Sequence, residues 1–353
     1  MSHDFHKLTV ASITPEIDGA ATSVVFNVPD ALQDDFTWTA GQHLTLRFAF
    51  DGEEERRSYT ISNPPGAELR ITVKRVKGGK VSNHIGDALN VGDEVEVMPP
   101  FGGFTLTPGA TARRTHYFFG AGSGITPLYA MINAVMTNEP FSVAHLVYGN
   151  ADAQSIIFQD SLSDLTDQHP DRLTVRHVLS SPSLWSWFTP WRTGRVDAAA
   201  ISVAISETPP EAQDVQYWIC GPGSMNGDVK SILMGLDVPA DRIHMESFGG
   251  AGKSTVPVTG SVAATAQITL NGVTHEVVVG KGQTVLQAAL TAGVDIPFSC
   301  QSGVCGACKA HLSEGKVHMS ARMALEDDEV ANNEILCCQS FPLTDRLNLS
   351  FGP

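Results

Sequence analysis

The sequence has little of several features that would each assign it to a broad class of protein. It contains no apolar run of about 18 residues or more, the length that a membrane-spanning helix needs. Its first residues, Met1-Ser2-His3-Asp4, lack the basic and apolar regions of a secretory signal peptide. Basic residues are outnumbered, with 23 Lys and Arg against 38 Asp and Glu, whereas a nucleic-acid-binding protein needs a basic face. We therefore expect a cytoplasmic protein with no membrane partner and no nucleic-acid partner.

Common ligand-binding patterns are missing as well. The 12 histidines show no H-x3-H or H-E-x2-H spacing, so we interpret them as ordinary surface or core residues rather than metal ligands. The usual dinucleotide fingerprint G-x-G-x-x-G is absent, because Ile125 stands where that pattern needs glycine or alanine. The 353 residues are 42% hydrophobic, which is enough to build cores in about two or three domains.

Cysteine is scarce, and five of the six cysteines lie near the C-terminus. Cys300, Cys305 and Cys308 have the spacing C-x4-C-x2-C, and the pair Cys337-Cys338 follows about thirty residues later. This is the spacing of a plant-type 2Fe–2S site, in which four thiolates hold two irons and one tight loop supplies three of them. The spacing predicts an iron–sulfur cluster in the last part of the chain.

Gly303 and Gly306 lie inside this cysteine loop, and they give its backbone the freedom to turn amides toward the cluster sulfurs. Two alternatives remain open. A zinc site favours paired C-x2-C knuckles, and only one C-x2-C is present. Disulfides need an oxidising compartment and usually a smaller scaffold. The cluster is the favoured interpretation.

The first hundred residues have the pattern of short strands separated by turns, without helical periodicity. Such a pattern predicts a small antiparallel barrel. The expected strands are Leu8 to Ile13, Thr22 to Val28, His43 to Phe50, Ser58 to Ser62, Leu69 to Val76, and Glu94 to Met98.

This segment also carries features suited to a pyrophosphate. Arg57 and Tyr59 share one face of a strand because side chains alternate along it, and an arginine can grip a pyrophosphate with several donors. The stretch Gly78 to Ile85 resembles a loop that opens a short helix, and its free amides offer a second anion site. Each feature alone is weak, because such strands and loops are commonly structural.

In the middle of the chain the pattern changes to alternating strands and helices, which predicts a parallel sheet covered by helices. The loop Gly120 to Pro127 joins the first of these strands to its helix, and Pro127 suits the first turn of that helix. Its glycines let the backbone approach a phosphate at the helix N-terminus. A late strand ends in Tyr217 to Gly223 and contains Cys220. A lone cysteine is most often a small buried hydrophobe.

The C-terminal part begins after a Gly-, Ser- and Thr-rich stretch, 249–266, that we interpret as a tether. Gln267 to Val279 is expected to fold as a hairpin, because Asn271-Gly272 is a strong turn signal. Thr284 to Ala292 is expected to be an amphipathic helix. The acidic run Leu325 to Glu329 is either a docking face or plain solvated surface.

Together these motifs resemble the ferredoxin-NADP reductase superfamily followed by a plant-type ferredoxin. The likeness rests on the R-x-Y-T strand with its G-x-x-S helix start, on G-x-G-x-G-x-T-P, on the C-G-P turn, and on the E-x-F that ends at Phe248. It implies an antiparallel β-barrel FAD-binding domain (1–110), an α/β parallel-sheet NAD(P)-binding domain (111–248), a linker (249–266) and an α+β β-grasp ferredoxin domain (267–353).

The resemblance also implies roles for individual residues. Thr126 and Cys220 would flank the nicotinamide as the catalytic pair, and Cys337 would not be a ligand. The expected cluster ligands are Cys300, Cys305, Cys308 and Cys338. The expected FAD contacts are Arg57, Ser58, Tyr59, Thr60, Lys74, Gly79, Lys80, Val81, Ser82 and Phe248. The expected nicotinamide-dinucleotide contacts are Gly120, Gly122, Gly124, Thr126, Pro127, Cys220, Gly221 and Pro222.

The choice between NADH and NADPH stays open. Ala151 and the pair Ser180-Ser181 stand where many NADPH-using relatives carry arginine, and Arg192 and Arg195 are candidate substitutes. A nearby aromatic stretch is interpreted as local packing, with partner contact as the alternative. It comprises Trp185, Trp187, Phe188 and Trp191.

These modules predict an electron path in which FAD accepts hydride and the cluster passes electrons on singly to a partner protein. Within the superfamily the chain most resembles the reductases of ring-1,2-phenylacetyl-CoA epoxidases, through His6 to Val10, Gly41 to Leu46, Asp51 to Glu54, and Gly194 to Asp197. Reductases of ketosteroid hydroxylases and of hybrid-cluster proteins have the same layout. A non-catalytic redox sensor is a further alternative, although a sensor needs no hydride-docking loops.

Overall fold

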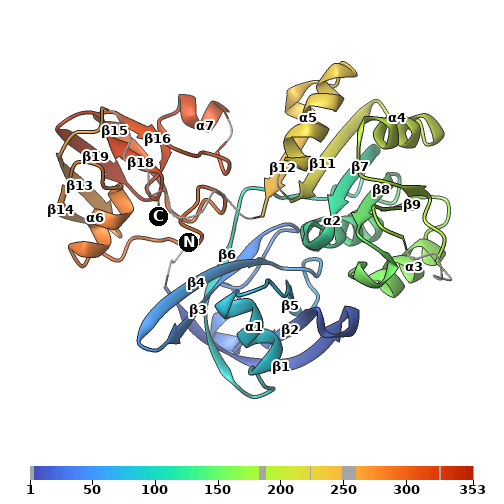
Figure 1. The fold of residues 1–353 in the computed structure, drawn as a ribbon, viewed down its shortest axis with the longest axis horizontal. Coiled ribbons are helices and arrows are strands. Elements are labelled where there is room, and N and C mark those ends of the chain that lie inside the picture. Colours follow the sequence, from blue (N-terminus) through green and yellow to red (C-terminus); the bar gives the residue numbers. More distant parts are fainter. Residues whose placement is uncertain (1–3, 183–187, 223, 249–259, 326, 353) are drawn as a thin grey trace.

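The computed structural model describes residues 4–182, 188–222, 224–248, 260–325 and 327–352. The chain forms three lobes, with the N-terminal barrel below, the central sheet on the right and the C-terminal lobe on the left (Figure 1). No helix in these ranges is long and apolar enough to cross a membrane.

The N-terminal lobe is an antiparallel sheet of strand order β4-β3-β6-β1-β2-β5. An antiparallel bridge between Ile61 and Ile71 brings the end of β4 to β5 and closes the barrel. Alternating residues such as Leu44 and Leu46 fill its core. Its elements are β1 (His6–Glu16), η1 (Ile17–Gly19), β2 (Ala21–Asn27), η2 (Asp30–Leu32), β3 (His43–Phe50), β4 (Glu53–Thr60), β5 (Leu69–Lys74), α1 (Lys80–Asp87) and β6 (Glu94–Phe101).

The central lobe is an all-parallel sheet of order β10-β9-β8-β7-β11-β12 with helices on both faces. On β7, Phe118 faces one core cluster and Phe119 the other, so the strand is apolar along both sides. The elements are β7 (Arg114–Ala121), η3 (Gly122–Gly124), α2 (Ile125–Asn138), β8 (Val143–Asn150), η4 (Ala153–Ser155), α3 (Gln159–Gln168), β9 (Leu173–Leu179), β10 (Arg192–Thr193), α4 (Ala198–Glu207), β11 (Asp214–Gly221), α5 (Met225–Gly235), η5 (Ala240–Arg242) and β12 (Ile243–Ser247).

The C-terminal lobe is a mixed sheet of order β14-β13-β19-β15-β17 with a small second sheet, β16-β18. Asn271 and Gly272 have φ of 51° and 76°, as a two-residue hairpin turn requires. Thr284 caps α6 by accepting from the amide of Gln287 at 3.2 Å. The elements are β13 (Ala264–Leu270), β14 (Val273–Val279), α6 (Val285–Thr291), β15 (Lys309–Glu314), β16 (Val317–Met319), α7 (Asp327–Ala331), β17 (Glu334–Leu336), β18 (Ser340–Pro342) and β19 (Arg346–Ser350).

The expected fold class is therefore confirmed, whereas several element boundaries differ. Strand β4 starts at Glu53, five residues before the expected strand, and its charged half pairs with β3 at the exposed edge. The sequence pattern predicts a helix from Ser155 to Leu165, but helix α3 starts at Gln159, because Phe158 adopts a left-handed φ of 62° that separates the helix from the preceding 3-10 turn. Trp185, Trp187 and most of the predicted tether lie outside the described residues.

A buried carboxylate joins the barrel end to the central lobe. Glu139 is fully buried, and it accepts from Arg114 Nη1 at 2.8 Å and from the Gly109 amide at 3.0 Å. Its Oε2 lies 3.1 Å from His116 Nε2, and the other nitrogen of that ring accepts from Trp218 Nε1 at 3.2 Å. Burial raises the pKa of Glu139, but the hydrogen bonds from His116 and Ser142 outweigh it and lower the pKa to about 2.

This network predicts an acid-sensitive core. Because the folded pKa of Glu139 is depressed, its ionisation stabilises the fold above its ordinary pKa of about 4.5 and stops doing so as the pH falls toward 2. We expect Glu139→Gln to lower the free energy of unfolding by about 3 kcal/mol at pH 7, with a difference from the wild type that shrinks below pH 4. Chemical unfolding at several pH values measures it, and a constant difference would contradict the assignment.

Candidate functional site

The cysteine loop presents its thiols in two neighbouring pairs. Cys300 and Cys305 are within hydrogen-bond reach of one another, and so are Cys308 and Cys338. Backbone amides point at the sulfurs: Ser302 and Cys305 donate to Cys300 Sγ at 3.4 Å, and Cys338 donates to Cys308 Sγ at 3.4 Å. The loop thus already has the amide-to-sulfur pattern expected of a cluster-binding segment.

Glycine is required within this loop. Gly303 has a φ of 78°, and a Cβ there would lie 2.8 Å from the carbonyl oxygen of Ala321. Gln339 Nε2 donates to the carbonyl of Gln301 at 2.9 Å, which ties the loop to the segment that carries Cys338. Cys337 is fully buried in the core of the lobe.

The four thiols fit a 2Fe–2S cluster better than a mononuclear metal. Each iron of such a cluster takes two protein ligands, which matches two pairs. Across the described residues, no group of three or more His, Cys, Asp or Glu comes together to hold one metal ion. The Cys305 thiol and nearby amides lower the pKa of Cys300 to about 5, as suits a thiolate ligand. The neighbouring thiol and burial raise the pKa of Cys305 and Cys308.

On the barrel, the predicted anion-binding residues converge. Arg57 Nη2 lies 2.9 Å from Glu55 Oε2, and Lys80 Nζ lies 3.7 Å from the same carboxylate. Lys80 opens α1, so both cations lie beside that helix N-terminus. Ser82 Oγ accepts from the amide of Val76 at 3.2 Å, and a Cβ on Gly79 would come within 2.6 Å of that oxygen. This cluster of cations and amides suits a pyrophosphate, with which the Glu55 carboxylate competes.

We therefore expect Glu55→Gln to tighten FAD binding about threefold to tenfold, because it removes the carboxylate that pairs with Arg57 without changing side-chain shape. Lys80 loses one of its two carboxylate partners and keeps Glu53 at 3.5 Å. Titration of the apoprotein with FAD, followed by flavin fluorescence, measures the dissociation constant. Glu94→Gln is the matched control, since that carboxylate pairs only at the surface with Lys7 at 3.1 Å. Weaker FAD binding by Glu55→Gln would contradict this arrangement.

In the central lobe, a cleft opens at the carboxyl ends of the parallel strands. It has a volume of about 630 Å³ and is lined by Gly122, Gly149, Pro222 and, from the barrel, Lys74. The sheet order places β7 next to both β8 and β11, so the cleft lies at the point where the strand order reverses. Nucleotides bind at this point in open α/β sheets.

Gly122 adopts a left-handed φ of 55°, whereas Gly120, Gly124 and Gly221 allow close packing. A Cβ on Gly124 would lie 2.0 Å from the carbonyl oxygen of Cys220, and one on Gly120 would lie 2.8 Å from Leu128 Cδ1. A Cβ on Gly221 would lie 2.6 Å from Met225 Sδ. The expected phosphate loop and the C-G-P turn therefore lie directly against each other.

The expected catalytic pair is buried. Thr126 is 2% exposed and donates to the Ser123 carbonyl at 3.1 Å, and Cys220 is 0% exposed. Burial, and then the nearby carboxyl of Glu246, raises the pKa of the Cys220 thiol. Burial raises the pKa of Glu246 to about 8, which favours the protonated form at neutral pH. Sequence reasoning noted only the E-x-F pattern around Glu246 and assigned the glutamate no role.

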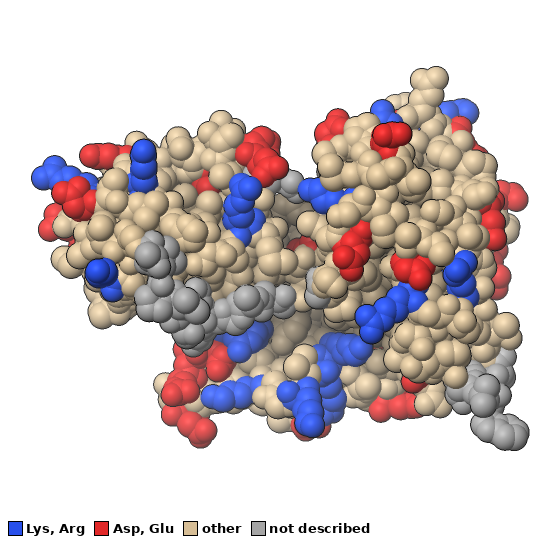
Figure 2. All heavy atoms as spheres, turned by 45° about the horizontal axis from the view of Figure 1, so that its top comes forward, with Lys and Arg blue, Asp and Glu red and all other residues tan. Residues whose placement is uncertain are grey.

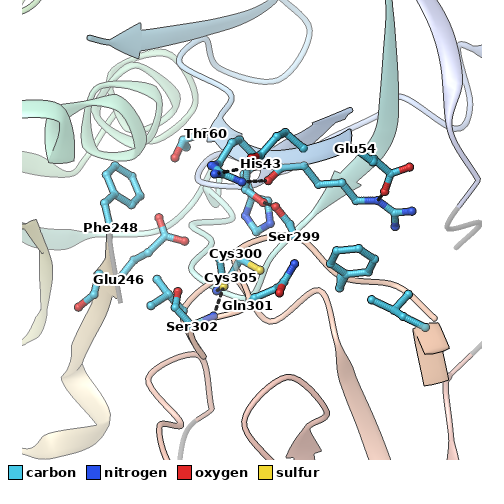
Figure 3. Close-up of a pocket in the computed structure, with 18 of the residues that line it drawn as sticks. His43, Glu54, Thr60, Glu246, Phe248, Ser299, Cys300, Gln301, Ser302 and Cys305 are labelled. Carbon is cyan, nitrogen blue, oxygen red and sulfur yellow. Dashed lines mark hydrogen bonds and ion pairs between the residues drawn. The ribbon is translucent and has the colours of Figure 1, made fainter. Parts of the chain in front are cut away.

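A larger cavity, of about 970 Å³, lies where the three lobes meet. The barrel contributes Ser58 and Thr60, the central lobe contributes Phe248, and the C-terminal lobe contributes Cys300 and Cys305 (Figure 3). Tyr59, on the opposite face of β4, packs against the barrel core, and burial raises its pKa. Lys and Arg side chains border the hollow in the middle of the face seen in Figure 2. The cavity is open to a ligand that touches all three lobes.

His43 also lines this cavity, and sequence reasoning gave it no role. It is 4% exposed, burial lowers its pKa to about 4, and its Nε2 has no hydrogen-bond partner among the described residues. In Figure 3 its ring lies between Thr60 and the cysteine loop. The only sequence signal was its strand position opposite Thr60, which needs the barrel register to be known.

Only some of the residues relevant to nucleotide preference line the nucleotide cleft. Arg195, Ala151 and Ser180 line the nucleotide cleft, whereas Arg192 lies on β10 and is half-buried. Among the described aromatic residues of the predicted stretch, the Phe188 ring contacts His177 at 5.3 Å, and Trp191 donates to Glu207 at 3.2 Å. These contacts are local packing.

Three lobes meet at one cavity: an antiparallel barrel with clustered cations, a parallel sheet with a nucleotide cleft, and a lobe with paired thiols. Together they define an iron–sulfur flavoprotein reductase. Family models match each part: an oxidoreductase FAD-binding domain over residues 15–106, an oxidoreductase NAD-binding domain over 118–231 and a 2Fe-2S iron-sulfur cluster binding domain over 268–343. The expected cofactors, FAD, a nicotinamide dinucleotide and a 2Fe–2S cluster, are thereby confirmed.

Curated relatives extend along the whole chain. It is 37% identical to one of the subunits of 1,2-phenylacetyl-CoA epoxidase from Escherichia coli (strain K12), over 98% of both chains. It is 33% identical to the 3-ketosteroid-9-alpha-monooxygenase ferredoxin reductase component of Rhodococcus rhodochrous, over 98% of this chain and 96% of the relative. Phthalate dioxygenase reductase has the same fold, with a TM-score of 0.58, 24% identity and 98% of both chains covered. The chain belongs to the family of FAD- and 2Fe–2S-containing reductase components of multicomponent oxygenases.

Proposed function

We propose that this chain takes electrons from a nicotinamide dinucleotide and delivers them singly to an oxygenase that acts on a coenzyme A thioester, as the name of the epoxidase relative suggests. The observation that carries the electron path is the cavity lined by the barrel, by Phe248 and by Cys300 and Cys305. When bound, FAD accepts hydride from the nicotinamide, and the cluster carries electrons one at a time. The protein sets their positions.

In this proposal each group of residues has a distinct task. Arg57, Lys80 and the α1 amides bind the FAD pyrophosphate. Cys220 and Glu246 present uncharged groups beside the nicotinamide, which the raised pKa of each supports. Phe248 excludes water from the cavity. The ligand set is Cys300, Cys305, Cys308 and Cys338, supported by their pairing.

We also propose the division 1–110, 111–248, 249–266 and 267–353 for the FAD domain, the NAD(P) domain, the linker and the ferredoxin domain. The matched ranges of the family models fall within these limits. The cytoplasm is the proposed location, because all six cysteines are unpaired and a nicotinamide reductant is found there.

An anaerobic titration with NADH and NADPH in parallel tests the proposal. We expect one of them to bleach both the flavin and the cluster bands, and cytochrome c to be reduced rapidly with the same nucleotide. A flavin that stays oxidised with an excess of NADH and of NADPH would contradict the proposed electron path. For the partner, the purified E. coli epoxidase oxygenase and the Rhodococcus ketosteroid oxygenase are compared as acceptors. Turnover with the ketosteroid oxygenase alone would contradict the thioester proposal and identify a ketosteroid oxygenase as the type of partner.

A further inference from the structure

A buried arginine joins the barrel to the segment that leads into the cysteine loop. Arg56 lies on β4, and its side chain is 4% exposed. Its Nη2 lies 3.0 Å from Asp295 Oδ1, and its Nε lies 2.7 Å from Glu54 Oε1. The guanidinium carbon lies 4.1 Å from the ring centroid of Phe298. The guanidinium is therefore held by one carboxylate of its own strand and by two side chains of the ferredoxin lobe, and the Phe5 ring centroid lies 5.0 Å away.

A second contact reinforces the same junction. Ser58 Oγ donates to Ser299 Oγ at 2.9 Å, and Ser299 directly precedes Cys300. Ser58 and Arg56 share a face of β4, because they are two residues apart on one strand. The strand that carries the proposed flavin contacts is thus bound directly to the stretch 295–299 that precedes the first cluster thiol.

The parts of this contact differ in strength. The Asp295 side chain is 65% exposed, so its ion pair contributes little and is weakened by salt. The contact with Phe298, which is 7% exposed, is sheltered, and a cation is attracted more strongly to a desolvated ring than to an exposed one. Arginine suits both partners at once, because its planar group stacks through its face and donates from its edge. The guanidinium face, more than its charge, holds the two lobes together.

We propose that Arg56 is a positioning residue for electron transfer from the flavin to the cluster. It docks residues 295–299 on β4 and thereby sets the separation between the barrel side of the cavity, at Ser58 and Thr60, and the thiols of Cys300 and Cys305 on its other side. This inference rests on the proposed function. With both cofactors bound, each transfer would oxidise the flavin by one electron and reduce the cluster by one, and the acceptor protein would reoxidise the cluster before the second electron of the hydride follows. Arg56 exchanges no proton and forms no bond, so it acts through distance alone.

Arg56→Ala tests the proposal by anaerobic rapid mixing of the holoprotein with the preferred nucleotide. We expect flavin reduction at the wild-type rate and cluster reduction slowed about tenfold, because the rate of electron transfer falls steeply as the separation of the two cofactors grows. Arg56→Lys keeps the charge but loses the planar stack, so its rate of cluster reduction should lie between those of the wild type and Arg56→Ala. Arg70→Ala is the matched control. It removes an arginine whose guanidinium carbon lies 5.2 Å from the ring centroid of Phe158 in the central lobe, and it should not slow cluster reduction.

Amide hydrogen exchange gives a readout that does not depend on turnover. Exchange in residues 295–302 should rise in Arg56→Ala and stay unchanged in Arg70→Ala. Asp295→Arg places a like charge against Arg56 from an exposed position, so it tests the contact even if Arg56→Ala does not fold. Cluster reduction at the wild-type rate in both Arg56→Ala and Asp295→Arg would overturn the proposal. Failure of flavin reduction in the wild-type protein would instead overturn the proposed function.

Discussion

Cys305→Ser is expected to abolish cytochrome c reduction while leaving flavin reduction by the nicotinamide intact. Serine has nearly the same size, but its hydroxyl does not ionise at neutral pH, and iron–sulfur clusters need soft thiolate ligands. The loss should be at least about a hundredfold, because removal of merely an outer-shell partner already costs up to that much. Rapid mixing separates the steps, since flavin and cluster absorb at different wavelengths.

Cys337→Ala is the matched control for this experiment. Cys337 is adjacent to Cys338 in the chain, yet its side chain is fully buried in the core of the lobe. We expect Cys337→Ala to keep the cluster spectrum and to lower stability by only about 1 kcal/mol. Cys338→Ala should lose the spectrum. If Cys305→Ser transferred single electrons at the wild-type rate, the path through the cluster would be wrong.

Gly124→Ala is expected to have the second-largest effect. Its new Cβ would meet the carbonyl oxygen of Cys220 at 2.0 Å and the amide nitrogen of Gly221 at 2.9 Å. Both atoms belong to the backbone of the central strand β11, so neither can move aside as a flexible side chain would. We expect the free energy of unfolding to fall by about 3 kcal/mol and flavin reduction by the nicotinamide to slow at least about tenfold.

Gly227→Ala is the control, and it is expected to change the stability in the opposite direction. Gly227 lies in α5, and a Cβ there has no heavy atom within 4 Å. Alanine in a helix should stabilise the protein by about 0.5–1 kcal/mol relative to glycine. Thermal unfolding and rapid mixing measure both variants. Equal behaviour of the two alanine variants would show that the loop and the C-G-P turn are not in the close contact that the structure gives them.

Local patterns accounted for the features that depend on neighbouring residues. The hairpin at Asn271-Gly272 and the cap at Thr284 follow from turn and capping chemistry within a few residues, and both are present. The cysteine spacing indicated a cluster because a tight loop requires ligands close together in the chain. The parallel sheet followed from the alternation of strand and helix patterns.

Features that depend on distant residues were not predictable in this way. The Arg56–Asp295 pair joins residues 239 positions apart, and no local pattern indicates which arginine of Arg56-Arg57 faces which lobe. Glu139 and His116 are charged or polar residues whose burial is stabilised by partners from other elements. The early start of β4 was missed because Glu53 to Arg57 are charged, which is tolerated at an exposed sheet edge.

The central claim is that electrons pass from the nicotinamide to flavin and then to the cluster inside one chain. Anaerobic rapid mixing of the wild-type holoprotein with one equivalent of the preferred nucleotide tests it most directly. We predict that flavin absorbance falls first, and that cluster absorbance then falls at a rate independent of protein concentration, because the transfer is intramolecular. Cluster reduction that precedes flavin reduction, or whose rate rises with protein concentration, would contradict the account.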